Sequence, residues 1–584
     1  GEQVTKAPAW KWALFGLILC LGAGLRWKLL PQSVMDGFDV WTYARITCEW
    51  AQGLIAPEGT WSKPGYMLLG AAASKLLGCG EATLPMLSAT LDTLNVALVF
   101  AAARLAGLSF LPACLAMLLY ACCPAMVLQA RDGLPHISSI TFVLTSYCLL
   151  LRGTLLEPGR VAARYLALLL GGFAGGYAGL CHPTVLLWTV FLPVVPVAWH
   201  LLRGRRVVAA LESGALYCLG AALPFLGFSA LVKDETDFVP KMASLWHSIF
   251  GHGDEQVYIK QTVSLTWDKL AHYGRDMLYA HVLTPHVAMA LAGMLALGLL
   301  AALLLRARGL RWRAVPAVMF RRPEALCGTA LLMALVFTGL VARINGFEQW
   351  FMGDRFFLPL MPFAALLGAA ALEGSARVLS PWLGGLAGAG AAAVALAAFF
   401  TLFPAYLYGT APFYNSLRAA LREQGLRVDD TSRLLVFPDR GVSPISVDRQ
   451  FTRTDVLTFK PTTLDEAGYA ELDAFIREKR VGLILYSPVV YIFITASEGQ
   501  APATEWENPE FRSRMEAQAR WLQGYLRSRG IAPAYCQGET GHDGEPVVRP
   551  VRVFSIGNHD FTAHLDQQRG RDNAFCLYET GAAK

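Results

Sequence analysis

Asp36, Asp39 and Lys63 are the residues whose types and spacing suggest chemistry. They lie in the stretch 31–83, directly after the first apolar segment, so we expect them beside a membrane surface. A positioned carboxylate there can take a proton from an acceptor hydroxyl, which typically contributes about 10²–10⁴-fold to a rate. A nearby cation stabilises the departure of a phosphate. This pairing suits the transfer of a sugar from a lipid phosphate, because the lipid tail holds its phosphate at the surface.

The composition places these residues in a membrane protein. The chain has 584 residues, of which 54% are hydrophobic and 16% charged, whereas soluble proteins carry about 25% charged residues. Charged residues make up 12% of residues 1–408 and 25% of residues 409–584. We therefore predict a transmembrane domain over 1–408 and a soluble domain over 409–584. The net charge of +6 indicates no nucleic-acid partner, because the excess lies in loops between spans.

Eleven stretches are apolar and long enough to cross a bilayer, which takes about 20 residues in a helix. The sequence thus predicts a multi-pass α-helical membrane protein with about 11 transmembrane helices. The stretches are 12–30, 84–103, 110–128, 137–151, 165–180, 185–202, 207–232, 282–305, 325–341, 356–372 and 382–408.

The basic residues distinguish the two sides of the membrane. Alternate loops lie on opposite sides, and the set that includes the N-terminus holds 16 basic and 5 acidic residues. By the positive-inside rule this set is cytoplasmic. After eleven spans, the domain 409–584 is then periplasmic or extracellular, and the chain belongs to the cytoplasmic (inner) membrane. We expect the first span to be retained, since no cleavage site of small residues follows it closely.

Four cysteines fall on the outer side, where disulfides form. Cys536 with Cys576 and Cys48 with Cys79 are plausible pairs, although connectivity does not follow from sequence. The loop 31–83, which contains Cys48 and Cys79, has apolar residues at helical spacing in two stretches. The first stretch begins at Phe38, and the second ends at residue 77. The pattern predicts two amphipathic helices that lie at the membrane interface.

The outer domain alternates between patterns typical of strands and of helices. Arg433–Phe437, Val481–Tyr486 and 551–556 are apolar runs expected to be buried strands, and 472–479 and 511–528 have amphipathic helical spacing, so we predict a small α/β layer. The domain contains no glycine-rich phosphate loop, serine nucleophile elbow or zinc-ligand spacing. We expect it either to bind or position an acceptor or to stabilise the membrane part as a lid.

Four motifs resemble those of the GT-C membrane glycosyltransferases, the class of bacterial aminoarabinose transferases and protein O-mannosyltransferases. They keep the family's order, and all four fall on the outer side. The run DVWTYA at 39–44 is similar to the DExxYA signature, Lys63-Pro64 to the KPP motif, RDGLPH at 131–136 to the second-loop segment, and RFFLPLMP at 355–362 to the RYxLPxxP run.

The resemblance implies an inverting glycosyltransferase that moves a hexosyl or pentosyl group from a polyprenyl-phosphate donor to a hydroxyl of a glycan, lipid or protein. Val40 stands where the family usually has Glu, which argues against a protein-mannosyltransferase specificity, and Gly65 replaces the second proline. The implied roles are catalytic base for Asp39, with Asp36 in reserve; donor-phosphate binding for Lys63, Arg131 and Arg355; and substrate binding for Asp132, Tyr43 and His136.

Each of these residues also has a simpler role open to it. Aspartates at such positions often cap helices, and lysines often extend to the membrane interface. Asp36 and Asp39 can serve as helix caps, and Lys63 can extend to the interface. Arg131 and Arg355 can instead anchor span ends or pair with Asp132 and Asp354.

We expect no cofactor and no metal site, although a divalent metal stays open. The histidines of the loop 233–281 lack compact ligand spacing. Two other classes of function also stay open, a membrane transporter or lipid flippase and an oligosaccharide polymerase or ligase. A transporter typically shows internal repeats and charges near the bilayer midplane, and neither is evident here.

Overall fold

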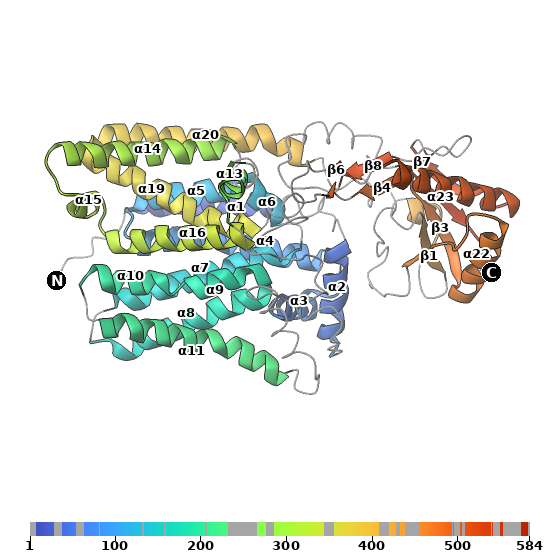
Figure 1. The fold of residues 1–584 in the computed structure, drawn as a ribbon, viewed down its shortest axis with the longest axis horizontal. Coiled ribbons are helices and arrows are strands. Elements are labelled where there is room, and N and C mark those ends of the chain that lie inside the picture. Colours follow the sequence, from blue (N-terminus) through green and yellow to red (C-terminus); the bar gives the residue numbers. More distant parts are fainter. Residues whose placement is uncertain are drawn as a thin grey trace.

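Long helices run side by side through most of the chain, and a small α/β domain lies beyond one end of them (Figure 1). The computed structural model describes residues 8–27, 38–53, 63–80, 82–130, 133–156, 159–204, 207–231, 265–275, 285–343, 356–407, 420–427, 432–437, 456–492, 494–495, 503–504, 508–538, 540, 549–552 and 574–581.

Every predicted span contains a helix, so the multi-pass membrane fold is confirmed. Nine helices among the described residues have the length and hydropathy of a span, and Phe110–Ala121 and Pro381–Ala397 are shorter apolar helices. Eight of the nine are α1 (Ala9–Trp27), α4 (Thr83–Leu105), α7 (Pro135–Leu155), α8 (Val161–Cys181), α11 (Val207–Leu231), α14 (Pro285–Ala307), α16 (Pro323–Arg343) and α19 (Met361–Val378), and the ninth is the composite span Pro183–Leu202. The apolar stretch Pro381–Ala397 belongs to the longer helix α20 (Pro381–Leu407).

Two predicted spans are broken by proline. The third span consists of α5 (Phe110–Ala121) and α6 (Pro124–Gln129). The sixth runs through the 3-10 turn η2 (Pro183–Val185), then α9 (Leu186–Phe191) and α10 (Val194–Leu202). Proline has no N–H for the helical ladder and clashes with the preceding turn. Pro124 and Pro193 therefore end the helices before them.

A buried ion pair supports the break between α5 and α6. Arg26 of α1 donates from Nη1 to the carbonyl oxygen of Ala121 (3.1 Å), which ends α5. Its Nε donates to Asp92 Oδ2 of α4 (2.5 Å), and the Tyr120 hydroxyl donates to Asp92 Oδ1. Both charged side chains have 0% exposure. This network ties α1, α4 and α5 together and gives a freed backbone carbonyl a donor, which the bilayer interior cannot supply.

Two short helices lie at the end of the bundle that faces the α/β domain (Figure 1). They are α2 (Phe38–Ala51) and α3 (Pro64–Leu77), which confirms the two helices predicted in the first long loop. α13 (Trp267–His272) also lies toward this end, whereas α15 (Val315–Met319) lies at the opposite end.

The C-terminal domain is an α/β layer, as predicted. Its sheet has the order β2-β1-β3-β9-β7, in which β1 runs parallel to β2 and β3, while β9 is antiparallel to β3 and β7. The strands are β1 (Arg433–Phe437), β2 (Val456–Thr458), β3 (Val481–Tyr486), β7 (Pro533–Gln537) and β9 (Phe575–Glu579).

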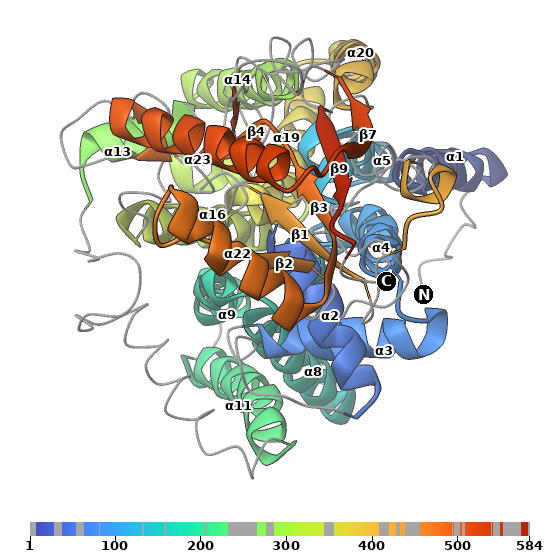
Figure 2. The ribbon, with the colours of Figure 1, turned by 90° about the vertical axis from the view of Figure 1, so that its right-hand side faces the viewer.

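Helices α22 (Glu466–Lys479) and α23 (Pro509–Ser528) cover the face of the sheet turned away from the bundle (Figure 2). Phe511, Met515 and Leu522 of α23 recur at helical spacing and are buried. Two small ribbons complete the described strands, β4 (Val489–Ile492) with β8 (Arg549–Arg552) and β5 (Ile494–Thr495) with β6 (Ala503–Thr504). The strand predicted at 551–556 overlaps β8, and residues 553–556 lie outside the described part of the chain.

We expect Arg26→Met to lower the free energy of unfolding by about 3–5 kcal/mol, because it leaves the Asp92 carboxylate buried without its partner. The melting temperature of the detergent-solubilised protein measures this loss. Arg164→Met is the matched control. Arg164 pairs with Glu212 at 3.0 Å with both side chains partly exposed, and such pairs contribute about 0–1 kcal/mol.

The double variant Arg26→Met/Asp92→Leu should recover most of the lost stability, since no charge then stays buried. If Arg26→Met melts at the wild-type temperature, the ion pair does not support the bundle.

Candidate functional site at the domain-facing end

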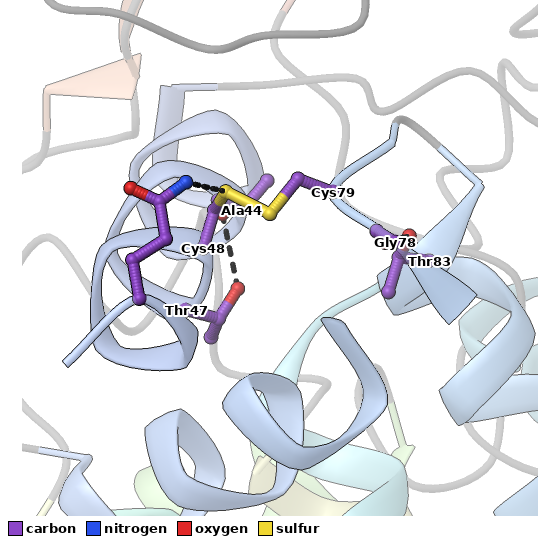
Figure 3. Close-up of a disulfide and its surroundings, with 7 residues drawn as sticks. Ala44, Thr47, Cys48, Gly78, Cys79 and Thr83 are labelled. Atoms are coloured by element: carbon purple, nitrogen blue, oxygen red, sulfur yellow. Dashed lines mark hydrogen bonds between the residues drawn. A yellow bond between two sulfur atoms is a disulfide. The ribbon is translucent and has the colours of Figure 1, made fainter. Parts of the chain in front are cut away.

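A disulfide fixes α2, the helix that carries two predicted site residues. Asp39 lies in the first turn of α2 and Tyr43 one turn later. Cys48 near the end of α2 is bonded to Cys79, two residues after α3 ends (Figure 3). Both predicted pairs are confirmed, since Cys536 of β7 is bonded to Cys576 of β9.

Lys63 contacts Tyr43, although the two motifs lie 20 residues apart in sequence. Lys63 directly precedes α3, whose first residue is Pro64. The Lys63 Nζ donates a hydrogen bond to the Tyr43 hydroxyl and stands 4.9 Å from the centroid of the same ring. Tyr43 is buried and Lys63 half-buried. The ammonium therefore has a fixed position at the start of α3, with both a hydrogen bond and a cation–π contact to hold it.

Tyr66 and Gly65 fix the first turn of α3 against the bundle. The buried Tyr66 hydroxyl donates to the carbonyl oxygen of Gly133, in the second-loop motif. Burial raises the pKa of Tyr66 well above its usual value, so the hydroxyl stays a neutral donor. Tyr177 of α8 donates to the carbonyl oxygen of Gly65 (2.9 Å).

Gly65, where the chain departs from the family's KPP motif, packs directly on α8. A Cβ at this position would stand 3.0 Å from the backbone carbonyl carbon of Leu180 and 3.1 Å from the amide nitrogen of Cys181. A second proline after Pro64 would meet the same obstacle. Glycine at this position therefore lets α3 pack directly on the backbone of α8.

His136 and His182 lie beside each other where α7 begins and α8 ends. Their ring centroids are 4.7 Å apart, and the Phe356 ring is 6.4 Å from His136 and 5.7 Å from His182. Nδ1 of His182 accepts from the backbone N–H of Thr184 (3.3 Å) and lies 2.7 Å from the Thr184 hydroxyl, so Thr184 fixes the ring's orientation. The start of the late motif thus meets the end of the second-loop motif.

The structure accordingly brings the four motif segments together. The contacts run from Tyr43 to Lys63, from Tyr66 to Gly133, and from His136 to Phe356. The predicted site residues Asp36, Arg131, Asp132 and Arg355 lie outside the described residues, and the roles assigned to the site residues stay predictions.

Sequence reasoning missed three contributors to this site. His182 was not among the predicted site residues, yet it directly precedes η2 and its ring packs on His136. Tyr66 and Tyr177 were absent from the predicted site because nothing in their spacing separates them from core aromatics. Among the described residues, no group of three His, Cys, Asp or Glu side chains is placed to hold a metal ion.

Comparison with known proteins identifies the fold. No protein-family model matches the chain, and no curated protein matches it by sequence. ArnT from Cupriavidus metallidurans in the apo state superposes with a TM-score of 0.55 at 14% identity, over 84% of this chain and 97% of that one. The same ArnT bound to undecaprenyl phosphate gives 0.51 at 13% identity, with the same coverage. The Archaeoglobus fulgidus oligosaccharyltransferase gives 0.47 at 13% identity, over 83% and 70% of the chains.

The protein therefore has the GT-C fold of membrane glycosyltransferases, as the motif resemblance implied. At these identities the likeness extends to the fold alone.

Removal of the disulfide in Cys48→Ser/Cys79→Ser should loosen α2. The bond closes a loop with a sequence separation of 31, and losing such a bond typically costs 2–4 kcal/mol. We expect faster amide hydrogen exchange in α2 and a lower melting temperature. Cys20→Ser, which alters an exposed free cysteine, should change neither. Unchanged exchange in α2 would show that packing alone holds the helix.

Proposed function

We propose that the protein is a glycosyltransferase that moves a sugar from a polyprenyl-phosphate donor to an acceptor hydroxyl at the domain-facing end of the bundle. The observation that carries this proposal is the Lys63 ammonium held against Tyr43 of α2. Asp39 precedes Tyr43 by four residues on that helix. A candidate base and a candidate phosphate ligand thus belong to one small unit.

In the proposed reaction, Asp39 accepts the proton of the acceptor hydroxyl as its oxygen bonds to the anomeric carbon. The bond between that carbon and the donor's phosphate oxygen breaks, and the polyprenyl phosphate leaves with the electron pair. Lys63 stabilises the negative charge that develops on the phosphate. A single displacement of this kind inverts the anomeric carbon. The acceptor is a hydroxyl of a glycan, lipid or protein.

The fold likeness supports a lipid-phosphate donor. The ArnT structure with a TM-score of 0.51 was solved with undecaprenyl phosphate bound, so this architecture accommodates a polyprenyl phosphate. The half-buried Lys63 at the start of an interfacial helix suits a phosphate whose lipid tail stays in the bilayer.

Two signals support a location outside the cytoplasm. Both disulfides belong to the part of the protein at the domain-facing end, one in the α2–α3 unit and one in the α/β domain. Disulfides persist in oxidising compartments. The arginine-rich loops lie at the other end of the spans, as the positive-inside rule predicts for the cytoplasmic side.

Asp39→Asn should lower turnover by about 10²–10⁴-fold, because asparagine cannot accept the proton. The assay supplies radiolabelled polyprenyl-phosphate sugars to the purified full-length protein in detergent and follows transfer or hydrolysis of the sugar. Asp36→Asn is the control, since it makes the same change three residues earlier.

Three outcomes would contradict parts of this proposal. If Asp36→Asn abolishes turnover and Asp39→Asn does not, the base is wrongly assigned. If only diphosphate-linked oligosaccharides react, the protein is a polymerase or ligase. If liposome transport survives Asp39→Asn and no sugar is transferred, it is a transporter.

Tyr43→Phe should lower kcat/KM for the lipid-phosphate donor about 10-fold or more, because a hydrogen bond to a charged group contributes about 1.5–3 kcal/mol. The variant keeps the ring under the ammonium and removes only the hydroxyl. Tyr535→Phe, which alters a half-buried tyrosine of the α/β domain, should leave kcat/KM unchanged.

A double-mutant cycle separates positioning from direct binding. If Tyr43 acts by positioning Lys63, Tyr43→Phe should add nothing to the loss caused by Lys63→Met. Fully additive losses would show that Tyr43 acts on the substrate by itself.

A further inference from the structure

Exposed tryptophans mark the membrane interface at the end of the bundle opposite the candidate site. Trp10 and Trp12 open α1, Trp382 opens α20, and Trp312 lies in the short 3-10 helix η4 (Trp312–Ala314) before α15. Their exposures are 54%, 54%, 75% and 54%, in the same order. Tryptophan prefers the headgroup level of a bilayer. These side chains therefore place this end of the helices at the depth of lipid headgroups.

The connection from α14 to α16 is rich in arginine at this depth. Residues 306–322 contain six arginines and no acidic residue. Val315 and Met319 of α15 pack on Ala301 and Leu305 of α14, so the segment folds back on the bundle and lies at its extremity (Figure 1). The exposed arginines of the segment are Arg306, Arg308, Arg311, Arg313 and Arg321.

Two further arginines converge on the turn between α4 and α5. Arg322 donates from Nη1 to the carbonyl oxygen of Leu105 (2.6 Å), and Arg104 donates to that of Leu108 (2.7 Å). Gly107 has a φ of +98°, and a Cβ there would stand 2.9 Å from Cγ of Arg322. Glycine thus lets the Arg322 side chain cross the turn. Both guanidinium groups bond to neutral carbonyls, and neither forms an ion pair with another residue in the described part of the chain.

This end of the bundle has fewer described carboxylates than arginines, so the carboxylates cannot neutralise all of the positive charge. Glu324 accepts from Arg203 (3.2 Å), and Glu373 accepts from Arg377 (2.6 Å). Within the described residues, no ion pair includes Arg306, Arg308, Arg311 or Arg313. The pKa of Arg322 is lowered from its usual value by burial and by repulsion from Arg104, Arg203 and Arg321. The cluster therefore holds an excess of positive charge.

We propose that this arginine cluster binds the phosphate headgroup of an anionic phospholipid from the adjacent leaflet. The guanidinium fork matches the oxygens of a phosphate and is always charged, and clusters of basic residues next to a membrane span attract anionic headgroups. The tryptophans place the cluster at headgroup depth, so the phosphate comes from the bilayer. Trp312 and Val318, both exposed, offer apolar surface to the lipid's acyl chains. This site is independent of the proposed sugar transfer.

The test titrates the purified full-length protein with phosphatidylglycerol and counts bound lipids by native mass spectrometry. Arg308→Gln/Arg311→Gln/Arg313→Gln should bind phosphatidylglycerol about 100-fold more weakly than wild type, at about fivefold per arginine. The control is Arg512→Gln/Arg514→Gln/Arg520→Gln, which removes three exposed arginines from α23. It should bind like wild type. Phosphatidylcholine should bind weakly and equally to all three proteins.

The proposal is overturned if the triple variant retains wild-type affinity for phosphatidylglycerol, or if the α23 control loses as much. Displacement of the lipid by millimolar inorganic phosphate alone would show a site for free phosphate instead. Restoration of wild-type binding by Arg→Lys at the same three positions would show a diffuse charge effect and would also contradict a guanidinium-specific site. Equal melting temperatures in phosphatidylcholine nanodiscs establish that the variants are folded.

Discussion

The bilayer's inability to satisfy backbone hydrogen bonds is the constraint on which this structure depends. A span in hydrocarbon must pair its own N–H and C=O groups, so each break in a helix needs a partner from elsewhere. At the break between α5 and α6, Arg26 supplies that partner to Ala121, and Asp92 in turn neutralises Arg26. A buried charge is therefore explained by Pro124, three positions beyond the end of α5, rather than by catalysis.

The same constraint confines open polar chemistry to the ends of the bundle. At the domain-facing end, the candidate site is built from segments far apart in sequence that pack on the first turn of α3. Gly65 allows the close approach to α8, Tyr66 reaches the second-loop motif, and Lys63 reaches α2. Since α3 contacts each of these neighbours through one turn, a shift of that turn would move the cation relative to the helix that carries Asp39.

Much of the fold follows from sequence because hydropathy and periodicity are local properties. The spans, α2, α3, β1 and β3 were all predicted, the last two with the bounds that the structure has. Strand β9 was missed, because five apolar-rich residues near the end of a polar stretch carry little periodic signal, and its place between β3 and β7 is a long-range property.

Only the part of the site that lies within sequence motifs could be predicted from the sequence. Order along the chain indicated which segments belong together, and the contact of Lys63 with Tyr43 agrees with that grouping. The contribution of His182 depends on where α8 ends relative to α7, which no local pattern encodes. The Arg26–Asp92 pair was likewise hidden, because a single aspartate does not lower the hydropathy of a 23-residue helix enough to stand out.

The two ends of the bundle differ in their disulfides and in charge, and these two properties arise from independent causes. Disulfides reflect the compartment in which the thiols are oxidised, whereas the arginine excess reflects how the chain was inserted. Among the residues that the structure describes, both bonded cysteine pairs belong to one end, and the arginine cluster belongs to the other. An inverted orientation would expose the disulfides to a reducing compartment. It would also place the arginine cluster outside the cytoplasm, which the positive-inside rule disfavours. Because two unrelated mechanisms would both have to fail, their agreement is stronger support for the proposed orientation than either charge or cysteine pairing alone.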